Sequence, residues 1–203
     1  MEMIQQQKPI IQHHPTNETR ILRPSEFEKL CNVVREKQRL QLQIMLLTGM
    51  RYSELRIFYK HPEWFNGKIL RIPDILKFDE LTMSRMVLRY ARKIRLSEMG
   101  RQVLPLFFEK SVKFPLRCSM DTNLKLWAYK AKIDDRGMTT KTLRKTWESW
   151  ILKKYNKRLG ENYTILLSSQ GYNNINEIFA KYLSFDFTID DIYEMGKYTK
   201  GWM

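Results

Sequence analysis

The spacing of apolar residues changes twice along the chain, and this change constrains the fold more than any other feature. Helical spacing near the start gives way to strand-like alternation in the middle and returns from Asn123 onward. The expected helices cover residues 24–34, 40–49, 53–58, 123–133, 139–155, 173–183 and 188–202, and the strand-like runs cover 64–72, 86–90 and 93–97. The sequence therefore predicts an α+β fold that is mainly helical and has a small antiparallel β-sheet.

Local signals predict some of the boundaries of these elements. Ser25 and Glu28 have the spacing of a capping box, which predicts that a helix begins there. Gly49 is a typical helix stop, and the pair Asn66–Gly67 predicts the tight turn of a hairpin. The segment 101–108 (RQVLPLFF) fits either a strand or the opening of a helix, and the sequence leaves both readings open.

The chain carries a large surplus of positive charge. Its 203 residues include 36 lysines and arginines against 22 aspartates and glutamates, which gives a formal net charge of +14. Such a surplus attracts polyanions and releases their counterions on contact. Nucleic acid is therefore the expected partner, with an anionic membrane surface as the weaker alternative. No apolar run has the length of about 20 residues that a membrane span needs.

The remaining composition favours a cytoplasmic chain with one main domain. The opening MEMIQQQKPI does not have the pattern of a signal peptide. Cys31 and Cys118 are the two cysteines, and neither lies in a CxxC pair, so we expect no disulfide framework and no zinc module. Residues 1–20 lack periodicity and are interpreted as a flexible tail. Residues 21–203, which include the expected helix 188–202, are interpreted as the domain.

Several common chemistries have no candidate residues in this sequence. It contains no glycine-rich phosphate loop, no GxSxG elbow, and no HExxH or other ligand spacing among its three histidines. The acidic pairs Asp134–Asp135 and Asp190–Asp191 fit a turn and a helix N-terminus. We therefore expect no nucleotide, no metal and no other cofactor.

Three widely separated motifs form the candidate site. They are TGMRYSEL at residues 48–55, KTLRKTW at 141–147 and GYNNINEIFAKY at 171–182. Each motif alone has a simpler interpretation. Arg51 follows a helix stop and has a glutamate three residues later with which it could pair, and Tyr182 could pack on an amphipathic helix. The three motifs occur together and in this order, which favours one common functional site over three separate structural roles.

These motifs resemble the signature boxes of the tyrosine recombinase (phage-type integrase) catalytic domain, whose usual forms are TGxRxSEL, HxLRHTF and GHSSIxTTxxY. Lys141 replaces the first histidine of the second box, as in integrases of archaeal viruses and plasmids. Tyr172 stands where the family has His, Trp or Arg, and the third box is one residue longer than its commonest form. The resemblance covers residues 23–202 and implies the catalytic-domain fold of that family.

The resemblance also implies a reaction and roles for these residues. Such enzymes are site-specific recombinases that cleave and rejoin DNA strands through a 3′-phosphotyrosine, which makes Tyr182 the nucleophile, with Tyr172, Tyr193 and Tyr198 as the alternatives. Arg51 and Arg144 would bind the phosphate, because a guanidinium is always charged and can donate to two oxygens. Lys141 would add a third cation, and Tyr172 would donate a hydrogen bond to the phosphate.

A hairpin lysine protonates the leaving 5′-oxygen in this family. Lys93 is the first candidate for that role and Lys77 the alternative. The implied partners are double-stranded DNA and further copies of the chain, which would assemble as a tetramer on DNA, with no membrane involved. Two other interpretations remain open. One is a catalytically impaired relative that only binds DNA, and the other is a basic helical scaffold for RNA or a membrane surface.

Overall fold

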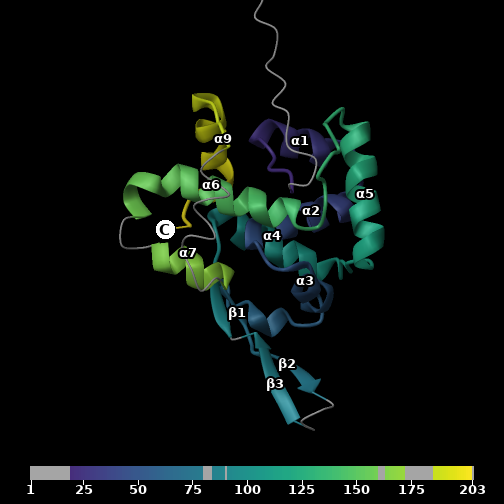
Figure 1. Ribbon diagram of the computed structural model, residues 1–203, viewed down its shortest axis with the longest axis vertical. Coiled ribbons are helices and arrows are strands. Elements are labelled where there is room, and N and C mark those ends of the chain that lie inside the picture. The colour runs from purple at the N-terminus through teal and green to yellow at the C-terminus, as the bar shows by residue number, and fades with distance from the viewer. Residues whose placement is uncertain (1–18, 80–83, 90, 160–162, 172–184, 203) are drawn as a thin grey trace, which may run out of the picture.

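Helices make up most of the described chain, and one β-hairpin projects away from them (Figure 1). The computed structural model describes residues 19–79, 84–89, 91–159, 163–171 and 185–202. The helices are α1 (Pro24–Asn32), α2 (Glu36–Thr48), α3 (Tyr52–Phe58), the 3-10 helix η1 (Pro62–Trp64), α4 (Glu98–Glu109), α5 (Arg117–Lys130), α6 (Thr142–Leu159), α7 (Tyr163–Gln170) and α9 (Ile189–Thr199). The strands are β1 (Ile69–Ile72), β2 (Ile75–Asp79), β3 (Ser84–Arg89) and β4 (Arg92–Arg95). The predicted α+β class is confirmed.

The four strands form two antiparallel pairs that follow each other along the same hairpin. The inner pair, β1 and β4, sets Ile69 opposite Arg95 and Ile72 opposite Arg92. The outer pair, β2 and β3, extends beyond it and points away from the helices (Figure 1). In β4 the side chains of Arg92 and Ile94 are buried and those of Lys93 and Arg95 are exposed. Neighbouring residues of β4 therefore face opposite sides of the sheet.

Helices α2 and α6 pack together at the centre of the helical body. Both bury residues on more than one side, as expected for helices that other elements surround. Trp147 and Trp150 of α6 have no exposed surface. Two hydrogen bonds attach the start of the described chain to α6. Trp150 Nε1 donates to the Leu22 carbonyl (2.9 Å), and the Leu22 N–H donates to Thr146 Oγ1 (3.0 Å).

The last helix docks on its own domain. An aromatic cluster joins α1, α6 and α9 through Phe27, Trp150 and Tyr198, whose ring centroids lie 5.2 to 6.2 Å apart. Met195 and Trp202 are also buried in this region. The helix thus contributes part of the core in the single chain. None of the helices in the described ranges is both long enough and apolar enough to cross a membrane.

The predicted capping box at Ser25 and Glu28 is wrong. Helix α1 begins earlier, with Pro24 as its first residue and Arg23 as its N-cap. The Arg23 N–H donates to a carboxylate oxygen of Glu26 (2.9 Å), so this bond takes the place of the expected one. Proline suits the first helical position because the N–H that it lacks would have no helical partner there.

The middle of the chain departs from the expected hairpin. The turn forms, because Asn66 Oδ1 accepts from the N–H groups of Lys68 and Ile69 (3.1 and 3.0 Å). Only one bridge, between Phe65 and Leu70, closes it, and β1 pairs instead with the distant β4. The ambiguous segment 101–108 is helical and lies within α4.

The predicted buried face of the last helix is also wrong in part. Helical spacing puts Ile189, Ile192, Tyr193 and Gly196 on one face of this helix, which predicts that this face packs against protein, but Ile189 and Tyr193 are 86% and 78% exposed. Asp191 is buried instead, and its carboxylate forms an ion pair with Arg23. The buried face is therefore rotated toward Met195 and the aromatic cluster.

This rotation gives a first testable prediction. Met195→Ala should lower the free energy of unfolding by about 2 to 5 kcal/mol, because it opens a cavity in a packed core. Ile189→Ala on the same helix should change it by no more than about 0.5 kcal/mol, because the side chain faces water. Urea unfolding of both variants measures the difference. Equal losses would contradict the observed orientation of α9.

Candidate functional site

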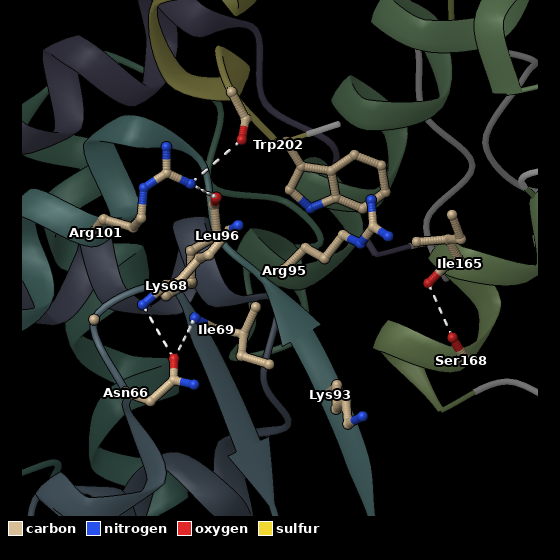
Figure 2. A pocket seen from close by; sticks show the side chains of 12 residues that line it. Asn66, Lys68, Ile69, Lys93, Arg95, Leu96, Arg101, Ile165, Ser168 and Trp202 are labelled. Carbon is tan, nitrogen blue, oxygen red and sulfur yellow. Dashed lines mark hydrogen bonds between the residues drawn. The ribbon is translucent and has the colours of Figure 1, made fainter.

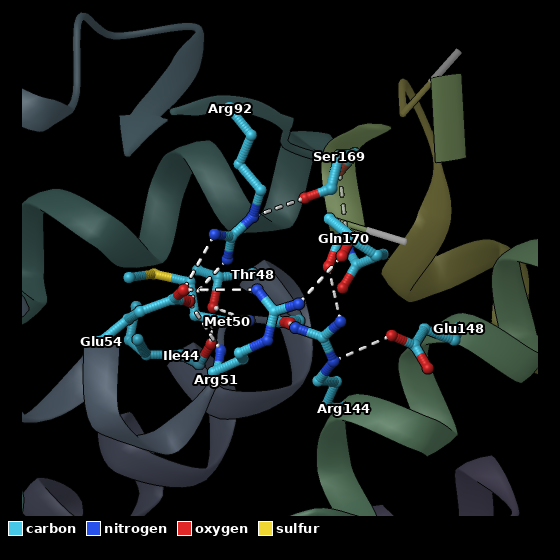
Figure 3. Close-up of polar contacts among 12 residues, drawn as sticks. Ile44, Thr48, Met50, Arg51, Glu54, Arg92, Arg144, Glu148, Ser169 and Gln170 are labelled. Carbon is cyan, nitrogen blue, oxygen red and sulfur yellow. Dashed lines mark hydrogen bonds and ion pairs between the residues drawn. The ribbon is translucent and has the colours of Figure 1, made fainter. Parts of the chain in front are cut away.

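Three arginines from three different elements converge on the C-terminal end of α7 (Figure 3). Arg51 is the N-cap of α3, Arg92 is the first residue of β4, and Arg144 lies in the first turn of α6. Their acceptors are three consecutive main-chain oxygens: Arg92 Nε donates to Ser169 (3.1 Å), Arg144 Nη2 to Gln170 (2.6 Å) and Arg51 Nη2 to Gly171 (2.9 Å). The last carbonyls of a helix lack helical partners and carry partial negative charge, so cations stabilise them.

Two buried carboxylates hold the three guanidinium groups. The side chains of Glu54 and Glu148 have no exposed surface. Arg92 donates to both oxygens of Glu54, from Nη1 (2.8 Å) and Nη2 (2.5 Å). Arg144 Nε lies 3.0 Å from Glu148 Oε1. Buried charges are stable only when they are paired in this way, so each carboxylate fixes its partner in place.

Glu54 serves a second arginine as well. It accepts the N–H of Arg51 (2.9 Å), and its other oxygen lies 3.5 Å from Arg51 Nη1. Burial by itself raises the pKa of Glu54, but the hydrogen bonds and charges of Arg92 and Arg51 outweigh it and lower the pKa below its usual value. Glu54 is therefore a carboxylate at neutral pH, and it is shared by two cations.

A close approach of two main-chain segments completes the site. Gly49 ends α2 with a left-handed φ of 57°, and a Cβ there would lie 2.6 Å from the side chain of Gln170. The Gly49 carbonyl accepts from Arg144 Nη1 (3.1 Å). In the amide orientation that satisfies its neighbours, Gln170 also donates to the Gly49 carbonyl (2.8 Å) and to Glu148 (3.3 Å). Only glycine fits at this position. The contact places the end of α2, and with it Arg51, against the end of α7.

The net charge of the cluster suits an oxyanion. Three arginines against two glutamates leave one positive charge, and Lys141, which lies just before α6 and three residues before Arg144, adds another cation. Guanidinium forks that bond to carbonyl oxygens have the donor geometry that phosphate oxygens need. The arrangement can therefore bind a phosphate group and stabilise negative charge on it.

The structure brings two of the predicted site residues together. Arg51 and Arg144, 93 positions apart in the sequence, donate to adjacent carbonyls. Lys141 is exposed just before α6, and its N–H donates to Thr139 Oγ1 (3.2 Å). Tyr172 and Tyr182 lie outside the described residues, as does the predicted helix 173–183.

The two candidate hairpin lysines lie on different strands of the hairpin. Lys93 is exposed, and it follows Arg92 on β4, so its side chain is on the opposite side of the sheet. There it lines a cavity of about 1000 Å³ (Figure 2), whose other basic side chains are Lys68, Arg95 and Arg101. Lys77 lies in β2 of the outer hairpin, paired with Met86.

Two residues of the cluster, Arg92 and Glu148, were not predicted from the sequence. Glu148 follows Arg144 by four residues on a helix, a spacing that could have indicated the ion pair. Arg92 had no comparable signal, because the segment 85–95 carries several arginines and only the register of the sheet decides which of them is buried. The two glutamates and Arg92 are the residues that fix the predicted arginines.

Comparisons with known proteins identify the fold. No family model matches the sequence, and no curated protein matches it. The structure is similar to that of the Tn1549 transposon integrase in complex with circular intermediate DNA, with a TM-score of 0.61 and 15% identity over 92% of this chain and 68% of that one. It is also similar to XerA recombinase, with a TM-score of 0.58 and 14% identity over 90% of this chain and 66% of that one. The chain therefore has the fold of the tyrosine recombinase catalytic domain.

Gly171 provides a test of how closely the arginines pack. Its φ is +67°, and a Cβ would lie 3.1 and 3.3 Å from the Arg51 guanidinium nitrogens. Gly67 also has a positive φ, +87°, but nothing lies within 4 Å of its Cβ position. Gly67→Ala should therefore cost only the backbone term of about 1 to 2 kcal/mol. Gly171→Ala should cost more, because Arg51 must move as well.

The measurement is the free energy of unfolding of both glycine variants. A loss at Gly171 no larger than that at Gly67 would mean that Arg51 does not pack against the end of α7 in solution.

Proposed function

We propose that the protein is a site-specific DNA recombinase or integrase that cleaves and rejoins strands through a 3′-phosphotyrosine intermediate. The observation that carries the proposal is the meeting of Arg51 and Arg144 at the end of α7. Their motifs match the two arginine boxes of tyrosine recombinases. The residue that Arg51 contacts, Gly171, opens the third box, which ends on Tyr182. The fold and the positive charge of the cluster support the same interpretation.

The reaction conserves the energy of the phosphodiester bond. The oxygen of Tyr182 forms a bond to phosphorus while the bond from phosphorus to the 5′-oxygen breaks, which leaves a phosphotyrosine and a free 5′-hydroxyl. Attack by a 5′-hydroxyl on the phosphotyrosine then releases the tyrosine and forms a new phosphodiester bond, with the same DNA strand or with another one. Negative charge builds up on the non-bridging oxygens in each transition state, and Arg51 and Arg144 stabilise it.

Three further residues have proposed roles in this reaction. Lys141 adds positive charge beside Arg144, and its presence in place of histidine is the reason to place the protein near integrases of archaeal viruses and plasmids. Tyr172 donates a hydrogen bond to the phosphate. The acid that protonates the leaving oxygen is Lys93 or, alternatively, Lys77.

The proposed partner is double-stranded DNA, on which the chain assembles as a tetramer in the cytoplasm of a host cell. The structure of residues 82–397 of the Tn1549 integrase was determined in complex with DNA, and this chain covers 68% of that chain. We assign residues 21–203 to the catalytic domain. Arg20, which was predicted to lie in the tail, is buried and pairs with Glu26 and Asp134, so it belongs with that domain. Residues 1–18 lie outside the described residues. DNA affinity rests on the same surplus of positive charge that the sequence shows, +14.

One observation favours the alternative of an impaired relative that only binds DNA. Lys93 faces the side of β4 opposite to Arg92, and so lies away from the arginine cluster. If Lys77 does not supply the proton instead, the leaving oxygen has no acid and strand cleavage is slow. A covalent protein–DNA adduct distinguishes the two functions, because a recombinase forms this adduct and an impaired relative that only binds DNA does not.

A trapping experiment tests the proposed function. The substrate is a pool of nicked DNA duplexes in which the sequence around the nick is randomised, so that no particular target site has to be assumed. The nick is included because it lets the short fragment with the free 5′-hydroxyl leave, which prevents religation. The wild-type chain should form an adduct that survives denaturant and also forms in EDTA, and peptide mapping should place it on Tyr182. Tyr182→Phe should abolish the adduct, and Arg51→Ala or Arg144→Ala should slow it by about 100-fold or more.

Tyr193→Phe is the matched control for the nucleophile. Tyr193 is 78% exposed on α9, so this variant should form adduct at the wild-type rate. An adduct that maps to another tyrosine would overturn the assignment of Tyr182. DNA binding without adduct from any member of the pool would overturn the recombinase proposal in favour of the impaired relative.

A further inference from the structure

Arg92 is buried at the centre of the site, and all its described contacts are internal. Its side chain is 5% exposed, and it donates to both oxygens of Glu54 and to the Ser169 carbonyl. A guanidinium in such a position loses its hydration and is stable only with this set of acceptors. Arg92 therefore does not belong to the exposed cations that attract DNA. Its place requires another explanation.

The position of Arg92 is important because its partner Glu54 also contacts Arg51. The same carboxylate accepts the Arg51 N–H and lies 3.5 Å from Arg51 Nη1. Arg92 holds it from the other side at 2.5 and 2.8 Å, so the nearer and bidentate partner is Arg92. Without Arg92, the buried carboxylate would draw the Arg51 guanidinium toward itself and offset its charge.

We propose that Arg92 is a positioning residue for strand cleavage: by compensating Glu54 and holding the Ser169 carbonyl, it keeps Arg51 in place and leaves the positive charge of Arg51 available to the phosphate. This inference rests on the proposed recombinase function, in which Arg51 binds the scissile phosphate. Arg92 acts through Arg51 and through the end of α7, and it does not touch the DNA.

The contact with Ser169 extends this role to the third box. Arg92 Nε holds the Ser169 carbonyl, and the next two carbonyls, of Gln170 and Gly171, are bound by Arg144 and Arg51. Arg92 Cδ also lies 3.3 Å from the position of a Cβ on Gly171. Because Arg92 begins β4, it connects the sheet to the point where the third box begins.

The shape of the guanidinium explains why arginine occupies this position. Nη1 and Nη2 reach two oxygens of one carboxylate while Nε reaches a carbonyl in a different direction. A lysine ammonium is a single point charge and cannot keep this planar pair of contacts. Arg92→Lys should therefore preserve the charge compensation of Glu54 but lose part of the positioning.

The test compares four variants by two readouts, the rate constant of adduct formation at saturating DNA and the dissociation constant for the same DNA. Arg92→Gln should lower the rate constant by about 10- to 100-fold, the range typical of residues that orient a ligand-binding side chain, with DNA affinity changed by no more than about twofold. Arg92→Lys should lie between Arg92→Gln and wild type. Glu54→Gln combined with Arg92→Gln should recover part of the rate, because no uncompensated carboxylate remains.

Arg20→Gln is the control for a loss of stability alone. Arg20 has a similarly buried side chain, 9% exposed, and pairs with Glu26 and Asp134 away from the site. Rates are compared at a temperature at which every variant is folded. Arg20→Gln should retain the wild-type rate. If it loses as much rate as Arg92→Gln, or if Arg92→Gln loses none, the proposal is wrong.

A spectroscopic readout separates this proposal from the proposed function. The ¹⁵N NMR signal of Arg51 Nε–H should shift in Arg92→Gln without any DNA, and it should remain in place in Arg20→Gln. An unchanged Arg51 signal in Arg92→Gln would overturn the positioning role even in an active enzyme. If wild type forms no adduct with the nicked pool, the recombinase function fails, and the Arg51 signal alone decides whether Arg92 positions it.

Discussion

The site depends on two carboxylates that are completely removed from water. Burying a charge is costly unless the charge is paired, so Glu54 and Glu148 each require a cation in a fixed position. Arg92 and Arg144 meet that requirement, and Arg51 shares Glu54 through its main chain and side chain. The guanidinium groups are thus held in place by buried glutamates. Rigid cations of this kind stabilise developing charge without first having to reorganise.

The helical body supplies the frame for these pairs. Helix α6 crosses the core with Trp147 and Trp150 buried, and this packing fixes Arg144 and Glu148 one turn apart. Helix α2 packs on α6 and ends at Gly49, where the chain turns directly to Arg51. The sheet contributes through β4, and α7 closes the cluster. Each cation therefore comes from an element whose position is determined by the core.

The sequence predicted those parts of the site that depend on local order along the chain. The boxes around Arg51 and Arg144 are read from consecutive residues, and the structure brings these two arginines together. Arg92 could not be found in this way, because its burial depends on the pairing of β4 with β1, where its partner Ile72 is 20 positions away. The orientation of α9 was mispredicted for a different reason. Asp191 is buried against Arg23, whereas the pattern argument assumes that charged residues face water.

The acceptors at the end of α7 are main-chain oxygens, which every amino acid provides. Substitution of Ser169 does not remove its carbonyl, whereas the matching donors exist only while arginine occupies the three positions that face it. Apart from Gln170, whose side chain contacts Gly49, and Gly171, whose positive φ favours glycine, the acceptor side of this interface is thus free to diverge in sequence, and the donor side is not. Two homologues could keep the same contacts with hardly a shared residue along α7. Distant relatives of this chain are therefore better recognised by their spaced arginines and buried glutamates than by the helix that those arginines bind.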